Sequence, residues 1–154
     1  MIRHMKPALV AVLLGAVALA GCGGEVDPAT TPAGRAQVQY LENLYNSRFG
    51  QAYATLHPAY KKLVTRSQFS DCAASTISTG QLDSIEVLDV FDDPVQVPGA
   101  GKQPAKGVRV RITSTSGKTV TFVSHEVQSG TRWFWVLNGP AVAAYKAGHC
   151  PGTA

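Results

Sequence analysis

The sequence predicts an α+β domain in which N-terminal helices pack on a curved antiparallel sheet of about four strands, followed by a short C-terminal helix. In the first half of the chain, apolar residues recur at steps of three and four, as on one face of a helix. In the second half, apolar and polar residues alternate, as in strands with one buried face. Short glycine-containing turns separate these later segments, which indicates an antiparallel meander.

The composition indicates one globular domain with little net charge. The chain has 154 residues, of which 45% are hydrophobic and 16% are charged, so it can form a core. The formal net charge of +4 includes Arg3 and Lys6 at the N-terminus, and without them 12 basic residues stand against 10 acidic ones. No basic block stands out beyond Lys61-Lys62, so nucleic acid is not an expected partner.

The first predicted helix begins at Thr31 and Pro32. The Thr31 hydroxyl can cap the helix, and proline suits its first position, where the missing N–H has no partner to lose. A single apolar stripe then follows at helical spacing, formed by Val38, Leu41, Leu44 and Tyr45. We expect a break or kink near Gly50, after Asn46-Ser47.

The helical half continues beyond this break. Its remaining predicted segments are a short helix over residues 49–56, one or two turns over residues 59–64, and a helix that runs towards residue 77. Pro58 ends the first of these because proline cannot continue a helix. Thr65 or Ser67 can cap the last one, and Gly80 ends the helical half.

The second half is expected to form a meander. The predicted strands are residues 84–91, 106–115, 118–128 and 131–137. In the second strand, Val108 and Val110 face one way, while Arg109 and Arg111 face the other. The turn-rich stretch 92–104 is expected to be an exposed loop. A short helix opens at Pro140 and ends at Gly148.

The N-terminus predicts export. A positive start is followed by an uncharged apolar run over residues 7–19, which is too short for a permanent membrane helix of about 20 residues but suits a signal peptide. The run ends in Leu19-Ala20-Gly21-Cys22, which resembles the bacterial lipobox. The resemblance implies that Cys22 receives a diacylglycerol thioether and becomes the first residue of the mature protein. The alternative is ordinary secretion with a chance cysteine at this position.

These features divide the chain into a signal peptide over residues 1–21, a flexible tether over residues 22–34 and a folded domain over residues 35–151. The tether is rich in glycine, proline and threonine and has no apolar periodicity. With Cys22 assigned to the anchor, Cys72 and Cys150 remain. An even pair in an exported chain is most simply a disulfide; the alternative is two unpaired buried thiols.

Three stretches carry a resemblance to a known fold. They read SRFGQAYATLHP, SQFSDC and WFWVL…AAYKAGHCP, within residues 35–151. The domain resembles the cystatin-like α+β cone of the NTF2-like superfamily, and more closely small actinobacterial lipoproteins with that domain. The resemblance implies a pocket between the helices and the concave sheet, used by some relatives for isomerase or dehydratase chemistry and by many only for binding. It also implies that Cys72 and Cys150 pin the C-terminal tail across the helices.

Candidate catalytic residues are few. His125 is the only weak candidate, because it is in phase with Val123 and Val127 on its strand and can face inward. Glu126 points to the opposite face, so the two do not form a ready dyad. Acidic residues gather along residues 83–93, where a solvated strand edge and turn are expected. Neither a metal-ligand spacing nor a cofactor motif is present, so we expect no metal and no cofactor.

Aromatic and arginine residues form the second set of candidates. They are more numerous than one sheet face needs, so part of them can line a pocket or a docking face. The alternative is that neighbouring segments cover both faces. The candidate residues are Tyr45, Tyr53, Phe69, Arg109, Arg111, Trp133 and Trp135.

The sequence therefore favours a lipoprotein held at the outer face of the cell membrane through Cys22. Its expected role is a non-enzymatic binding or interaction module for a small apolar ligand or an envelope protein. Two alternatives remain open: a small isomerase or cyclase that uses the pocket, and a structural component of the cell envelope.

Overall fold

The computed structural model describes residues 26–77 and 81–152, and it has the predicted α+β architecture. Within these residues, four α-helices and two 3₁₀ turns accompany a four-stranded antiparallel sheet in the order β1-β4-β5-β6. The predicted signal peptide, the lipobox and Cys22 lie outside the described residues, as does Gly80.

The helical layer follows the predicted order. After a 3₁₀ turn, η1 (Pro28–Thr30), it comprises α1 (Pro32–Tyr45), α2 (Phe49–Ala54), the 3₁₀ turn η2 (Tyr60–Lys62) and α3 (Arg66–Thr76). Thr31 caps α1 through its side chain, as expected. The break after α1 falls at Ser47, whose φ of 58° lies in the left-handed region, and not at Gly50. Gly50 lies inside α2, where a Cβ would collide with the guanidinium of Arg66.

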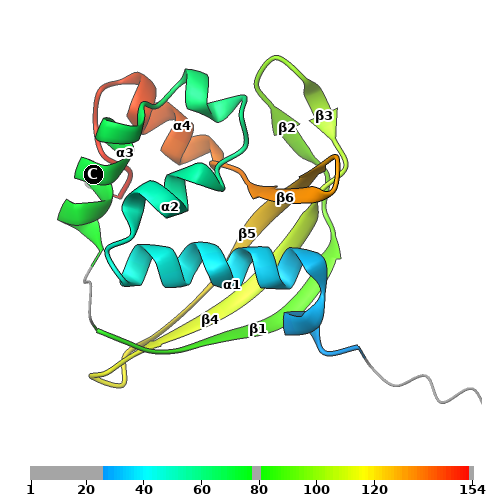
Figure 1. Cartoon of the computed structure of the whole chain (residues 1–154), viewed down its shortest axis with the longest axis vertical. Helices are drawn as coiled ribbons and strands as arrows, with labels where there is room; N and C mark the ends of the chain where they lie inside the picture. The colour runs from blue at the N-terminus through cyan, green and yellow to red at the C-terminus, as the bar shows by residue number, and fades with distance from the viewer. Residues whose placement is uncertain (1–25, 78–80, 153–154) are drawn as a thin grey trace, which may run out of the picture.

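The sheet is built from long strands and a short last strand. Its members are β1 (Leu82–Asp92), β4 (Lys106–Ser114), β5 (Thr119–Ser129) and β6 (Arg132–Trp135). Tight turns at Gly117 and Gly130, both with positive φ, join the last three strands as predicted. The final helix, α4 (Gly139–Lys146), is capped by Asn138. Figure 1 shows α1 running across the strands, with α2, α3 and α4 gathered near its C-terminal end.

The expected exposed loop over residues 92–104 was wrong. Residues 92–104 are not simply an exposed loop, because they contain a second, two-stranded sheet of β2 (Val95–Val97) and β3 (Gly101–Gln103). Val97 is only 1% exposed, and the hydroxyl of Tyr60 donates a hydrogen bond to the carbonyl of Gln96 at 3.2 Å. Contacts with the distant η2 segment therefore fold this stretch onto the core, which local turn propensity alone does not reveal.

The core lies between the helical layer and one face of the sheet. On β4, Val108 and Val110 are fully buried, whereas Arg109 and Arg111 are exposed on the opposite face. The buried face therefore carries the even-numbered residues of β4. The main helical contributors to the same core are Leu41, Leu44, Leu56, Tyr60, Val64 and Phe69.

Candidate binding cavity

A cavity of about 370 Å³ lies between the helices and the sheet. Its walls come from α1, α3, α4, the central part of β5 and the start of the segment that follows β6. A volume of this size is at the lower end of the range found for small-molecule sites. The side chains that shape it include Tyr40, Leu44, Phe69, Phe122, Trp135 and Tyr145.

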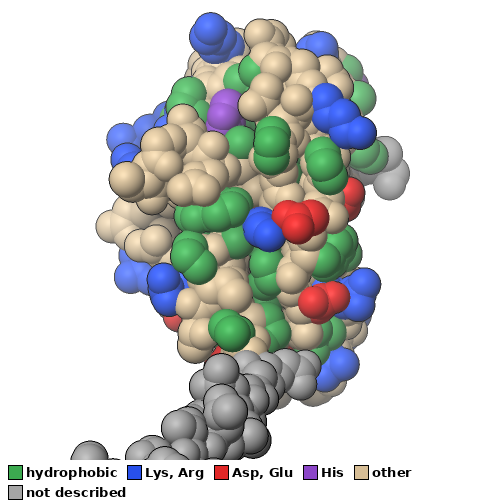
Figure 2. All heavy atoms as spheres, turned by 90° about the vertical axis from the view of Figure 1, so that its right-hand side faces the viewer, with side chains coloured by type: hydrophobic (Ala, Val, Ile, Leu, Met, Phe, Trp, Pro, Cys, Tyr) green, Lys and Arg blue, Asp and Glu red, His purple; other side chains and the backbone are tan. Residues whose placement is uncertain are grey.

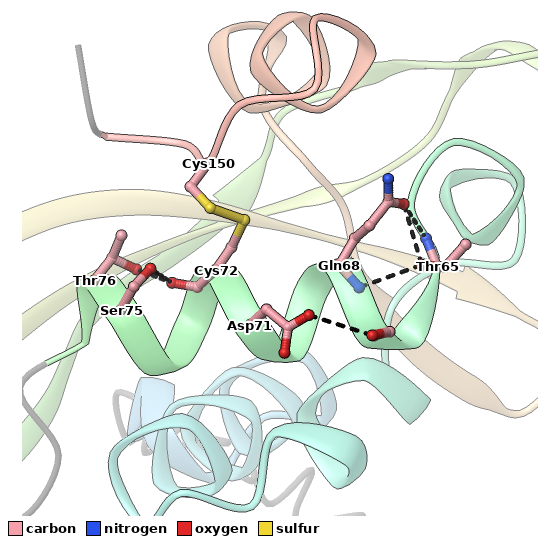
Figure 3. Close-up of a disulfide and its surroundings, with 8 residues drawn as sticks. Thr65, Gln68, Asp71, Cys72, Ser75, Thr76 and Cys150 are labelled. Carbon is pink, nitrogen blue, oxygen red and sulfur yellow. Dashed lines mark hydrogen bonds between the residues drawn. A yellow bond between two sulfur atoms is a disulfide. The ribbon is translucent and has the colours of Figure 1, made fainter.

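A disulfide fixes one side of this cavity. Cys72 on α3 is bonded to Cys150, which follows α4, and their Cα atoms are 5.2 Å apart (Figure 3). Helix α3 itself starts at a capping box, in which the side chains of Thr65 and Gln68 each bond the other residue's backbone N–H. The bond between Cys72 and Cys150 confirms the predicted pairing of the two cysteines.

Helix α4 covers the cavity without entering the core. None of its residues is buried, although Ala141 and Tyr145 line the cavity. It is held where the chain leaves β6 and, just beyond its C-terminal end, at the disulfide. Its attachment at both ends and the partly buried Ala141, Val142 and Tyr145, which pack against the edge of the core, therefore position α4.

Aromatic stacking forms the floor of the cavity. The rings of Tyr40 and Trp135 are stacked with centroids 4.2 Å apart, and Phe69 packs against Trp135 at 5.8 Å. The indole Nε1 of Trp135 donates to the carbonyl of Ala52 at 3.2 Å, which satisfies its buried N–H. Elements from both halves of the chain thus meet at Trp135.

The cavity wall contains no Asp, Glu, Lys or Arg side chain among the described residues. Burial raises the pKa of Tyr40 far above its usual value, and electrostatic interactions with Tyr145, Glu126 and Tyr45 raise it further. Burial also raises the pKa values of Tyr45 and Tyr145. The phenols therefore stay neutral at physiological pH, and the wall suits an uncharged, largely apolar group.

Glu126 lies close to Tyr40 on this floor but does not line the cavity. The residue is 1% exposed, and burial raises the pKa of its carboxyl to about 9. Neither carboxyl oxygen has a hydrogen-bond partner among the described residues. Lys106 is its partner in the sheet register, but the Lys106 ammonium bonds Asp92 at 2.7 Å instead. Glu126 is therefore a neutral acid at neutral pH.

The buried position of Glu126 was not anticipated. Sequence reasoning placed it on the face opposite His125, which is correct, but did not place that face against the helices. The sequence feature that could have revealed it is that Glu126 lies on the same strand face as Phe122 and Ser124. These two residues are the cross-strand partners of the buried Val110 and Val108 of β4. Gln37 on α1 is likewise buried with both amide atoms unpartnered in the described part of the chain.

His125 occupies the other face of the sheet. Its Nε2 lies 2.7 Å from Oδ2 of Asp93, and its side chain is 25% exposed. Because it alternates with Glu126 and shares the face of Arg109, its imidazole is turned away from the Tyr40–Trp135 floor, although its residue contributes to the cavity rim. This geometry gives His125 no position for acid–base work on a group inside the cavity.

The aromatic candidates separate into two groups. Tyr45, Phe69 and Trp135 line the cavity. Tyr53 does not, because its hydroxyl donates to the carbonyl of Val64 at 3.0 Å beneath the α2–α3 connection. Trp133 lies half-buried near the N-terminal part of α1.

Arg109 and Arg111 lie on the open face of the sheet in cross-strand pairs. Arg111 bonds Glu86 at 2.9 Å, and Arg109 lies 3.8 Å from Asp89. Figure 2 shows red acidic side chains beside blue basic ones on the flank of the molecule, with green hydrophobic side chains between them. Since each arginine has an acidic neighbour, the two do not form a free anion-binding pair.

Comparison of the chain with protein families, characterised proteins and solved structures gives no significant match. In the described ranges, His, Cys, Asp and Glu side chains form no group of three that could hold a metal ion. Within the same ranges, no helix has the length and apolar character needed to cross a membrane.

Proposed function

We propose that this chain is a bacterial lipoprotein whose extracytoplasmic domain is a non-enzymatic binding module with a site for a small apolar ligand. The cavity between α1, α3, α4 and the sheet is the observation that carries the proposal. Its wall is mostly aromatic and aliphatic, with Thr76, Ser124, His125 and Asn138 as polar members, and its phenols are neutral. Cys22 would hold the module at the outer face of the membrane. The tether would be shorter than the predicted residues 22–34, because η1 begins at Pro28 and Ala33 is buried in α1.

The same observation supports the finer description of the fold as a variant of the NTF2-like cone. In such a domain, helices close one side of a concave sheet and leave a pocket at the open end. Here the helices lie on one face of the sheet, and the pocket opens between them and β5. The support is architectural, and the function is argued from the cavity itself.

The enzymatic alternative has less support. Acid–base chemistry in this cavity needs a titratable group that reaches the substrate. The nearest carboxyl, in Glu126, has both oxygens inaccessible, and the imidazole of His125 is bonded to Asp93 outside. The alternative of a structural envelope component leaves the cavity without a role.

A fluorescent probe tests the binding proposal. The neutral tricyclic dye 1-aminoanthracene is expected to bind saturably with a rise in fluorescence. Ala141→Trp, which places an indole in the cavity wall, should weaken binding about tenfold or more. Ala143→Trp is the matched control, because Ala143 lies on the same helix but is exposed outside the cavity. Equal binding by both variants, or no saturable binding by the unmodified chain, would refute the proposed site.

A further inference from the structure

Part of β5 has a strand on one side only. The strand pairs with β4 from Thr119 to Glu126, but β6 covers only Glu126 to Ser129. No other described strand lies against residues 119–124. This half of β5 is therefore an open edge in the middle of the sheet order.

Two hydrogen bonds identify which backbone groups face this edge. The carbonyl of Lys118 accepts from the N–H of Ser114, on the β4 side, at 2.9 Å. The carbonyl of His125 accepts from the N–H of Val136, on the opposite side, at 3.1 Å. Since these directions alternate along a strand, the N–H and C=O groups of the odd-numbered residues Thr119, Thr121 and Val123 point away from β4. Within residues 26–77 and 81–152, these groups have no hydrogen-bond partner.

The opposite edge of the sheet, β1, is built differently. Its pairing with β4 is interrupted by register shifts at Leu82/Ser84 and Val87/Asp89, and it carries acidic side chains along its length. Bulges and charges are the usual means by which proteins prevent other strands from pairing with an edge. From Thr119 to Val123, β5 pairs with β4 without a shift and carries neither a charge nor a proline. Its Val120 and Val123 are 52% and 42% exposed.

We propose that Thr119–Val123 of β5 is a docking site for an extended segment of a partner protein, which adds a strand to the sheet. The segment would bond to Thr119, Thr121 and Val123 through its own backbone. Residues of the segment on the side of Val120 and Phe122 should be apolar, because Val120 is 52% exposed and Phe122 is only partly buried, so an apolar side chain would cover them. Phe122 and Val123 also border the cavity, but the docking uses the backbone edge of β5 and does not require a side chain of the segment to enter the cavity.

The register argues against a second copy of this chain as the occupant. Symmetric antiparallel pairing of two β5 edges about Thr121 places Gly117 of a second copy opposite His125. That part of the edge is already occupied by Val136, so a second copy would have to displace the segment before α4. A single extended segment that ends at Val123 meets no such obstacle.

Amide hydrogen exchange of the full chain tests the edge itself. The N–H groups of Thr119, Thr121 and Val123 should exchange much faster than those of Val120, Phe122 and Ser124, which bond β4. Uniform protection in dilute protein would overturn the proposal, because it would mean that the edge is already covered. Protection that appears only when the protein alone is concentrated would identify a second copy as the occupant and would also overturn it.

A synthetic peptide tests the docking. The probe is a blocked peptide with the sequence of residues 106–114, which already pairs with the other edge of β5. At saturating, millimolar peptide, exchange at Thr121 and Val123 should slow about tenfold. Two versions of the peptide form a matched pair: one is N-methylated on the backbone of its even-numbered residues, and the other on the backbone of its odd-numbered residues. Only one of them should lose binding, because only one set of N–H groups faces β5. No protection by the unmodified peptide, or equal binding by both methylated versions, would refute backbone docking.

A protein variant separates the edge from the cavity. Thr121→Pro removes an edge N–H without breaking a bond to β4 and should abolish peptide protection, whereas the control Thr121→Val should retain it. Retained protection in a folded Thr121→Pro variant would contradict the proposal. Ala141→Trp, which fills the cavity, should leave protection of Thr121 unchanged. Failure of dye binding and failure of peptide docking are therefore independent results.

Discussion

Cys72 and Cys150 are joined although 78 positions separate them in the sequence, and the bond ties α3 to the chain that leaves α4. Cys72 is buried, whereas α4 contributes no buried residue. The disulfide therefore connects a well-packed helix to one that lies on the surface. Because α4 covers the cavity, this bond determines how firmly the cavity is closed.

Removing the disulfide should destabilise the domain. In the chain-entropy account, closing a loop of this length contributes about 4 kcal/mol, and measured values are often smaller. Replacing both cysteines by alanine is expected to lower the free energy of unfolding by about 2 to 4 kcal/mol, measured by denaturant titration. Loss of the disulfide should accelerate hydrogen exchange of the backbone amides more in α4 than in α1. A loss below about 1 kcal/mol would contradict this account of the disulfide.

Lipid attachment at Cys22 makes a separate prediction. Cys22→Ser should release the protein from the membrane fraction or leave its signal peptide uncleaved, because serine lacks the nucleophilic sulfur. Fractionation and intact mass report both outcomes. Gly24→Ser, in the tether, is the control and should remain lipidated. A Cys22→Ser protein with unchanged mass and unchanged membrane association would show that the anchor lies elsewhere.

Several local features were predictable because they depend on neighbouring residues alone. Thr31 and Thr65 cap the helices at which they were expected, and Gly117 and Gly130 form the turns of the meander. The alternation of residues along β4 likewise identified its buried face. Caps, turns and strand periodicity are set within a few residues, so a single sequence carries them.

The features that were missed depend on residues far apart in the chain. The β2–β3 hairpin is held by the packing of Val97 and by the bond from Tyr60 to Gln96. Periodicity on β5 favoured the side of Val123 and Val127 as the inner one. In the structure Glu126 faces the helices instead, because β4 fixes the register. Periodicity shows that two faces differ, but the neighbouring elements decide which face is covered.

The two tryptophans of β6 should contribute different amounts to the free energy of unfolding, although both lie on the same face of the strand. Trp135 is 5% exposed and donates to Ala52, whereas Trp133 is half-buried. Trp135→Phe is expected to cost about 1 to 3 kcal/mol, because it removes one hydrogen bond and leaves a small cavity. Trp133→Phe is the matched control and should cost less than about 1 kcal/mol. Equal losses in denaturant titrations would mean that Trp135 is not the centre of the aromatic floor.

The buried carboxyl of Glu126 should make stability depend on pH. Burial raises its folded-state pKa from the ordinary 4.5 to about 9. Between these values the unfolded chain has lost the proton and the folded chain retains it, so the folded state binds more protons. Stability therefore decreases as pH rises through this window, with a slope of up to about 1.4 kcal/mol per pH unit from this group.

Glu126→Gln isolates this contribution, because glutamine has nearly the same shape and cannot ionise. The variant and the unmodified chain should be similar in stability near pH 4, where the carboxyl is protonated in both states. The variant should become progressively more stable than the unmodified chain up to about pH 9. Glu86→Gln, which alters an exposed ion pair with Arg111, should show no such trend. Denaturant titrations of all three proteins across this range measure the difference, and parallel pH profiles for the unmodified chain and Glu126→Gln would show that Glu126 ionises freely in the folded state.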